Sequence, residues 1–205
     1  MKKILLLLLT AICITGCEYF SDSGSSKPKF AKFSKNTIKF RKNTIMLTKG
    51  YEKTSPEEFK ARLDSLQDSP KFKKIALEEL KKIENKNVDF QLFVDERNVE
   101  NYVFIYACDY YQLDEHRAAT VVEALSRQLK DEALSQDVRY KRIHGRFFFT
   151  PTSKIVKLKY LKGYKMEKKY QAEYIVASRS GGIGLLISNL ENVDFENSIK
   201  RLASK

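Results

Sequence analysis

The chain has 205 residues, with 38 Lys and Arg against 26 Asp and Glu, and a formal net charge of +12 at pH 7. This length is sufficient for one domain with its own apolar core. Two of the three cysteines fall within the first 17 residues. The composition therefore excludes a disulfide framework and a zinc site built on paired Cys and His residues.

The N-terminus begins with two lysines, Lys2 and Lys3, followed by a stretch from Ile4 to Ile14 that is apolar except for Thr10. A positively charged start before a short apolar segment is typical of a secretory signal peptide. The stretch is too short to span a bilayer, which needs about 20 residues. We therefore expect a signal peptide rather than a transmembrane helix.

The signal-like segment ends in the sequence ITGC, whose last residue is Cys17. This motif resembles the lipobox of bacterial lipoproteins, in which the cysteine thiol is diacylated and the chain is cut just before it. The resemblance implies a cleaved signal peptide over residues 1–16, a covalent lipid on Cys17 with no further cofactor, and a membrane-anchored place in the cell envelope. Glu18 favours the outer membrane if the organism is Gram-negative. The sequence does not indicate which leaflet of the membrane holds the lipid.

Residues 18–35 are rich in Ser, Gly, Pro and Lys and lack hydrophobic periodicity. This composition predicts a flexible tether. Its 18 residues would span ~60 Å when fully extended, which would let a domain stand clear of the membrane. The expected organisation is a lipidated cysteine with its tether over 17–35 and a single soluble α+β domain over 36–205.

The first half of this domain shows strand and helix signals in turn. Two short strands around a basic turn predict a hairpin, at 37–40 and 44–48. Ser55, followed by Pro56 and Glu58, is a capping box that predicts the start of a helix. The helical period is interrupted at residues 68–70 and then continues to Ile83.

Two strands and a second helix follow. We expect strands at 88–95 and 102–108, the second in the interior of the sheet because it is apolar on both faces. Asp114 then caps a helix whose apolar residues repeat with helical spacing up to Leu129.

The last part of the chain is mostly strand. Segments rich in β-branched and aromatic residues predict strands at 138–150, 154–161, 169–178 and 183–188, and a short helix opens at Asp194. Short links favour antiparallel pairing. The predicted fold is α+β, a mainly antiparallel sheet of about six to eight strands with two or three helices packed on it.

The order of these elements, and a closing run of the strand YQAEYIVA, a glycine turn and the segment DFENSIKRL, resemble the PsbP-like family of photosystem extrinsic proteins. The resemblance implies a fold and carries no function with it, because one fold serves many functions.

Charge is distributed unevenly along the chain. Between Arg139 and Lys169 there are eleven basic residues and one acid, interleaved with aromatic residues. Single-stranded nucleic acid binders use such a pattern, but an envelope lipoprotein rarely meets nucleic acid, and we expect no nucleic acid partner. Two interpretations stay open: an ordinary half-exposed strand with a solvated basic face, and a surface for an anionic envelope protein, lipid or glycan.

The residues expected to contact such an anionic partner are basic residues of this segment: Arg139, Lys141, Arg142, Arg146, Lys157, Lys159 and Lys162. If the face is functional, charge reversal at Lys157 and Lys159 should weaken partner capture and leave folding intact.

Catalytic and metal-binding signals are weak. Cys108, Asp109, His116 and His144 are the one plausible nucleophile-and-base set, and their positions favour a core thiol with two surface histidines. Asp109 with the acids at 114 and 115 lacks the regular oxygen spacing and glycine of a calcium loop.

The glycine-rich segment 180–184 lies between two strands, which favours a hairpin turn over a phosphate-binding loop. We therefore expect no catalytic and no metal-binding residues. The expected function is a non-catalytic binding or accessory module of the envelope, with a structural or scaffolding lipoprotein as the alternative and a cysteine-dependent hydrolase as a third reading.

Overall fold

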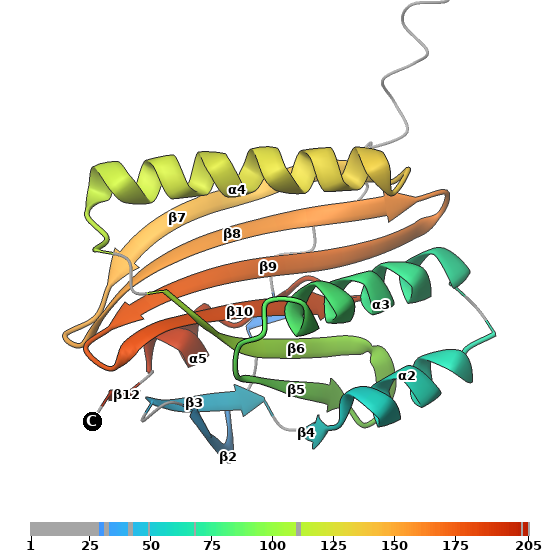
Figure 1. Ribbon diagram of the computed structural model, residues 1–205, viewed down its shortest axis with the longest axis horizontal. Coiled ribbons are helices and arrows are strands. Elements are labelled where there is room, and N and C mark those ends of the chain that lie inside the picture. The colour runs from blue at the N-terminus through green and yellow to red at the C-terminus, as the bar shows by residue number, and fades with distance from the viewer. Residues whose placement is uncertain are drawn as a thin grey trace, which may run out of the picture.

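A computed structural model describes most of the chain beyond the tether, namely residues 29–30, 33–40, 43–48, 50–67, 69–109, 112–201 and 203–204. Cys17, the expected signal peptide and most of the expected tether lie outside the described residues. Within these residues the fold is α+β, with a seven-stranded antiparallel sheet carrying helices (Figure 1). The predicted fold class is confirmed.

The seven strands of the main sheet pair antiparallel with each neighbour. In spatial order they are β4 (Tyr51–Thr54), β5 (Phe90–Asp95), β6 (Asn98–Cys108), β10 (Gly181–Asn189), β9 (Glu167–Ser178), β8 (Ser153–Tyr164) and β7 (Arg139–Phe149). The expected interior position of the 102–108 strand is confirmed, because β6 lies between β5 and β10.

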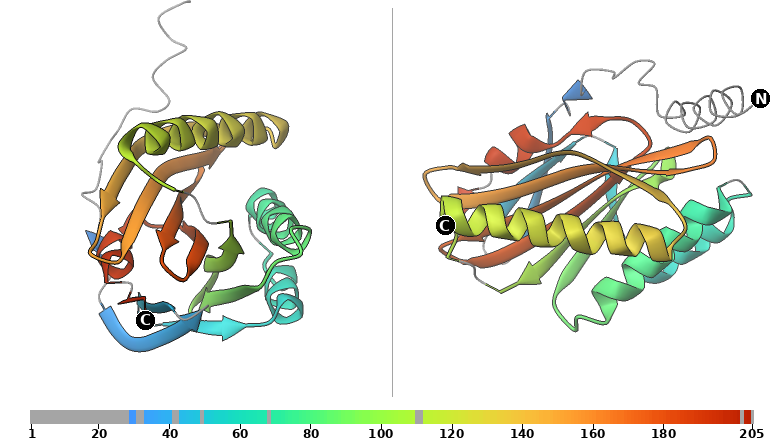
Figure 2. Two further views of the ribbon diagram at one scale, coloured as in Figure 1. Left: turned by 60° about the vertical axis from the view of Figure 1, so that its left-hand side comes forward. Right: turned by 90° about the horizontal axis from the view of Figure 1, so that it is seen from above.

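One face of the sheet is covered by three helices, α2 (Pro56–Asp64), α3 (Pro70–Glu84) and α4 (Glu115–Ser135) (Figures 1 and 2). The starts of α2 and α4 follow the predicted capping signals. Ser55 accepts a hydrogen bond from the Glu58 backbone N–H at 3.1 Å, and Asp114 accepts one from the Arg117 N–H at 2.8 Å. The caps therefore fix where α2 and α4 begin.

The opposite face is covered by smaller elements from both ends of the chain (Figure 1). These are β1 (Lys29–Phe30), β2 (Phe33–Phe40), β3 (Asn43–Thr48), β11 (Val193–Asp194), α5 (Glu196–Lys200) and β12 (Ala203–Ser204). The predicted hairpin at 37–40 and 44–48 is confirmed as β2 and β3, but it belongs to a separate three-stranded sheet with β12. Because β1 pairs with β11, the first described strand lies beside the C-terminal segment on this face.

The main sheet buries four lysine side chains. Lys157, Lys159, Lys162 and Lys169 lie on β8 and β9, and each is at most 2% exposed. The expectation that the first three form an exposed basic face is wrong. The reason is that β8 lies between β7 and β9, with α4 packed on one face and β11 and α5 on the other, so an alternating strand is covered on both faces.

Each buried lysine meets a partner from another element. The Lys157 Nζ lies 2.7 and 2.9 Å from the two carboxylate oxygens of Asp194 and 3.1 Å from Glu196. Lys159 donates to the Val193 carbonyl oxygen at 3.0 Å. Burial lowers the pKa of Lys159 to about 8, with the Asp194 charge opposing this shift and Lys157 adding to it.

Because Lys157 is buried and held by both Asp194 and Glu196, replacing both acids by Ala in one variant should leave an uncompensated interior charge. We expect the free energy of unfolding, measured by urea denaturation, to fall by about 3–5 kcal/mol. The control is Glu191→Ala, which breaks the pair with Lys29, whose side chains are 69% and 65% exposed. It should cost less than about 1 kcal/mol. Equal losses in the two variants would contradict the structural role of the buried pair.

Candidate functional site

The other four predicted basic residues remain exposed. Arg139, Lys141, Arg142 and Arg146 lie on β7, the edge strand of the main sheet, and together form what we call the basic edge. The structure therefore separates the seven predicted contact residues into three buried lysines and this exposed set.

A bulge divides the basic edge between the two faces of the sheet. The register of β7 against β8 shifts between Arg142 and His144. Arg142 lies on the α4 side and contacts Glu123 at 2.6 Å, whereas Arg146 lies on the opposite side and contacts Glu196 at 3.3 Å. The basic edge therefore presents charge to both sides of the sheet rim.

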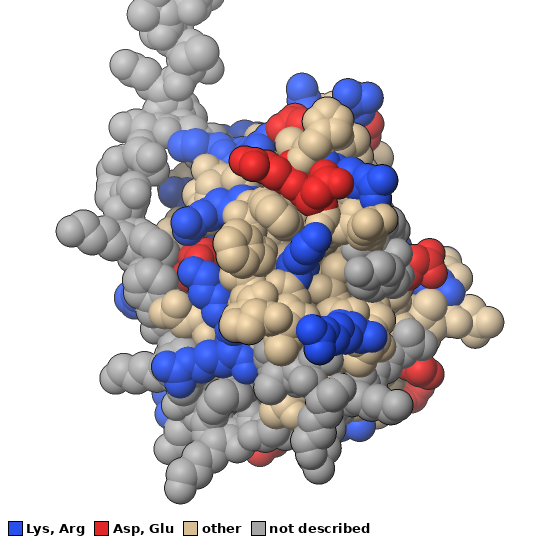
Figure 3. All heavy atoms as spheres, turned by 90° about the vertical axis from the view of Figure 1, so that its left-hand side faces the viewer, with Lys and Arg blue, Asp and Glu red and all other residues tan. Residues whose placement is uncertain are grey.

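Figure 3 shows the end of the molecule at which the β7–β8 and β9–β10 hairpins turn. Lys and Arg side chains are separated there by uncharged surface, and acidic side chains lie among them. This face is a mixed surface rather than a continuous basic patch.

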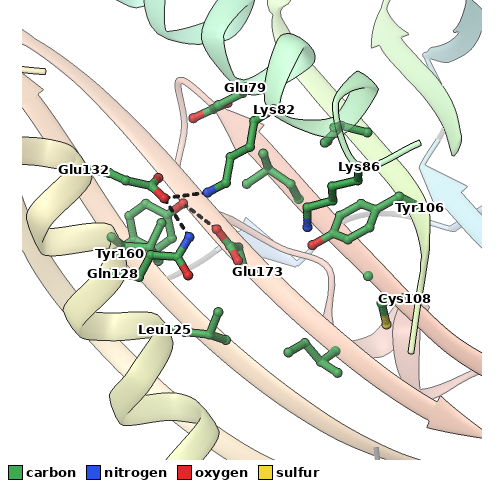
Figure 4. Close-up of a pocket in the computed structure, with 15 residues that line it drawn as sticks. Glu79, Lys82, Lys86, Tyr106, Cys108, Leu125, Gln128, Glu132, Tyr160 and Glu173 are labelled. Carbon is green, nitrogen blue, oxygen red and sulfur yellow. Dashed lines mark hydrogen bonds and ion pairs between the residues drawn. The ribbon is translucent and has the colours of Figure 1, made fainter. Parts of the chain in front are cut away.

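A second feature is a groove between α3 and α4, with a volume of about 370 Å³. Its floor is formed by the helix-covered face of the sheet (Figure 4). The lining residues are Glu79, Lys82, Ile83, Lys86, Tyr106, Cys108, Leu125, Gln128, Leu129, Glu132, Tyr160, Glu173, Ile175, Gly184 and Leu186. Ligand pockets commonly have volumes of about 300–1,000 Å³, so the groove suits a small ligand.

Polar bridges join the two helices at one end of this groove. The Lys82 ammonium group on α3 lies 2.5 Å from the Glu132 carboxylate on α4, and Gln128 donates to the same carboxylate at 2.7 Å (Figure 4). Beyond them, Gln136 donates to Glu78 at 2.8 Å. These contacts fix the spacing of α3 and α4 at the polar end.

Glu173 lies on the floor of the groove, in the middle of β9. Its neighbours on the same face of the adjacent strands are Leu158 and Leu186, both apolar. The Tyr160 hydroxyl donates to its carboxylate at 3.4 Å. Burial raises the pKa of Glu173, although the Lys82 charge opposes the shift. An acidic group thus lies between apolar residues of the two adjacent strands, with charged groups of α3, α4 and β8 facing it.

The other end of the groove contains a glycine, Gly184 of β10. Gly184 has no side chain, and a Cβ there would lie 2.3 Å from atoms of the Tyr106 ring. The ring can therefore lie against the β10 backbone. The Lys86 ammonium group lies 4.4 Å from the centroid of the same ring. The Tyr106 ring thus forms the wall at this end.

Beneath the polar end lies a buried hydrogen-bond network centred on Glu79. Its carboxylate accepts from Tyr102 at 2.7 Å, from Lys162 at 3.1 Å and from Gln171 at 2.9 and 3.2 Å. Burial alone would raise the pKa of Glu79, but the charge of Lys162 and the hydrogen bonds outweigh it and lower the pKa. Glu79 is therefore held as a carboxylate within the core.

The nucleophile-and-base set is not brought together. Cys108 lines the groove at the end of β6, whereas His144 lies on β7, separated from it by β10, β9 and β8 and on the opposite face of the sheet. His116 is exposed in the first turn of α4. Burial lowers the pKa of His144, and the charge of Lys157 adds to this effect.

Two of the three acids at 109, 114 and 115 belong to the start of α4, Asp114 as its cap and Glu115 in its first turn. Asp114 caps α4, and across the residues that the structure describes no group of three or more His, Cys, Asp or Glu could hold a metal ion. Gly181, with φ of +118°, occupies the turn between β9 and β10, as the sequence predicted. Within the described helices, none is long and apolar enough to cross a membrane.

Glu173, Glu132 and Lys82 of the groove were not predicted from the sequence. One available signal was the polar pair Gln171 and Glu173, which falls on a single face of β9 within the otherwise apolar stretch from Tyr170 to Ala177. In the sequence, charged helical residues such as Lys82 and Glu132 look the same as the charged residues on the solvent-exposed face of any helix.

The fold is similar to the solution structure of cyanobacterial PsbP (CyanoP) from Synechocystis sp. PCC 6803. The TM-score is 0.53 at 10% sequence identity, with 91% of this chain and 99% of that chain covered. This confirms the predicted PsbP-like resemblance as a likeness of fold, and at such low identity it carries no function. No protein-family model and no curated protein sequence matches the chain.

Because the folded pKa of Glu79 lies below its unfolded value of about 4.3, its ion pair stabilises the fold fully above that pH and is lost as the pH falls through the folded pKa. Replacing Glu79 by Gln should therefore flatten the loss of unfolding free energy on acidification below about pH 5. Urea denaturation at several pH values measures this slope. The exposed variant Glu57→Gln should keep the wild-type slope, and a wild-type slope in Glu79→Gln would refute the assignment.

Proposed function

We propose that the chain is a membrane-anchored envelope lipoprotein whose domain is a non-catalytic binding or accessory module, and that its basic edge contacts an anionic partner. The observation that carries this proposal is the exposure of Arg139, Lys141, Arg142 and Arg146 on an edge strand, while the other lysines predicted to bind are buried. The partner chemistry is an anionic envelope protein, phospholipid or glycan.

The place where the chain enters the domain supports action close to a membrane. Lys29 begins β1, which pairs with β11, and the Lys29 ammonium group lies 2.8 Å from Glu191. Eleven residues separate Cys17 from Lys29. Even fully extended, this segment reaches only ~40 Å, so a lipid on Cys17 would keep the domain near the bilayer.

A structural or scaffolding lipoprotein is the second candidate, favoured by the bulge on β7. Native proteins protect edge strands from unwanted pairing with exposed Lys and Arg side chains and with bulges. If the chain is a scaffolding lipoprotein, the basic edge prevents edge-to-edge association and binds no partner. The two candidates differ in whether loss of charge changes partner binding.

Charge reversal at Lys157 and Lys159 cannot test this function, because both side chains are buried. A carboxylate in place of Lys157 would be buried beside Asp194 and Glu196 and would destabilise the fold. The test must therefore use exposed residues.

We expect replacement of the four basic-edge residues by Gln to weaken binding to anionic partners about tenfold, because exposed charges steer association. The assays are salt-dependent capture from crosslinked native envelopes and sedimentation with vesicles of phosphatidylglycerol against phosphatidylcholine. The matched control removes the same number of exposed positive charges elsewhere, at Lys53, Lys74, Lys81 and Lys130. Equal binding by both variants would favour the scaffolding function.

In the same experiment, a Cys17→Ala variant distinguishes the contribution of the lipid anchor to membrane association from that of the basic edge. The variant should leave the membrane fraction, because exposed basic residues contribute much less to anchoring than two or three acyl chains do. Retention of this variant in the membrane fraction would contradict the lipid anchor.

A further inference from the structure

The charges that line the groove between α3 and α4 do not all find partners within it. Glu79 is neutralised by Lys162 beneath the floor, and Glu132 by Lys82 across the groove. Glu173 has no ion pair among the described residues, and its one hydrogen bond, from Tyr160, is long at 3.4 Å. One carboxylate on the floor is therefore left without a cation.

The position of Glu173 makes an unpaired carboxylate unusual. A carboxylate between Leu158 and Leu186 on a covered sheet face is costly, because burying an ionised group without a partner is unfavourable. A leucine there would continue the apolar row. The carboxylate is partly accessible from the groove, so a ligand can reach it.

The rest of the groove indicates the shape of that ligand. Between Glu173 and the end formed by Tyr106, Lys86 and Cys108, the lining includes the apolar side chains of Leu125, Leu129 and Ile175. Polar groups beside a run of apolar side chains are typical of sites for amphipathic small molecules.

We propose that this groove binds a small primary amine with an apolar portion, the ammonium group at the Glu173 carboxylate and the apolar portion against Ile175, Leu125 and Leu129. The site lies apart from the basic edge on β7, so this inference stands or fails independently of the proposed function.

Charge complementarity selects an amine over an anion. The groups that face Glu173 are Glu79 and Lys82 of α3, Glu132 of α4, and Tyr160 and Lys162 of β8. Both lysines already hold a carboxylate, and the remaining lysine of the lining, Lys86, lies over the Tyr106 ring at the other end of the groove, so an anionic head group at Glu173 would meet acids. An ammonium group would supply the missing partner and would stabilise the ionised form of Glu173. Amine binding should therefore weaken as acidification protonates this carboxylate.

The test is a titration of the purified full chain with n-hexylamine, 1-hexanol and hexanoate, which share one apolar chain length and differ in head group. Methyl NMR locates the binding. We expect n-hexylamine to shift the Ile175 methyl signals, with little change at Ile187 and Ile199, which pack on the opposite face of the sheet. The amine should bind about tenfold more tightly than the alcohol, as expected for a charge-assisted hydrogen bond.

Variants at position 173 separate binding from folding. Glu173→Gln keeps the shape, and we expect it to lower the affinity for n-hexylamine to that for 1-hexanol. Glu57→Gln makes the same change at an exposed site on α2 and should bind as the wild type does. Glu173→Leu should remain folded, because it continues the apolar row of Leu158 and Leu186, and should likewise lose the preference for the amine.

The proposal would be overturned if hexanoate or 1-hexanol bound as tightly as the amine. It would equally fail if Glu173→Gln and Glu173→Leu, both folded by circular dichroism, kept the wild-type affinity. Methyl shifts centred on the opposite sheet face would also refute it.

Discussion

The structure depends on lysines that lie inside the main sheet and on acids that reach them from other layers. Lys157 on β8 is held by Asp194 and Glu196 of the C-terminal segment, and Lys162 on the same strand is held by Glu79 of α3. Each ion pair therefore fastens a different element to β8. Removing one residue of a buried ion pair leaves its partner's charge in an interior that cannot solvate it. These ion pairs therefore determine which layers pack together, and they also stabilise the packed layers.

This constraint also determines which charges are available for binding. The four buried lysines of the sheet are committed to internal partners, and the predicted contact residues that stay exposed all lie on β7 at the rim. Lys154, Lys165 and Lys168 of the same segment are exposed as well. On the helix-covered face, the same pairing leaves Glu173 without a cation at the floor of a groove. The proposed contact with an anionic partner and the proposed amine site thus lie on separate parts of the domain and use opposite charges.

Local signals in the sequence predicted much of the fold. The caps at Ser55 and Asp114, the interrupted helix and the run of strands after 138 appear in the structure because they depend on neighbouring residues. The burial of Lys157 could not be predicted, because alternating Lys and apolar residues describe a half-exposed strand equally well. Its partner Asp194 lies 37 positions away. The groove could not be predicted for the same reason, since residues of α3, β6, α4, β8, β9 and β10 form it.

The central claim is that Lys157 and Lys162 are buried in ion pairs rather than exposed on a basic face. Acetylation of the native chain with an N-hydroxysuccinimide ester, followed by mass spectrometry, measures the reaction rate of each lysine directly. The account predicts that these two lysines react on the order of a hundredfold more slowly than exposed Lys141, because reaction requires the core to open. In denaturant the rates should converge. Acetylation of Lys157 in the native chain as fast as that of Lys141 would contradict the account.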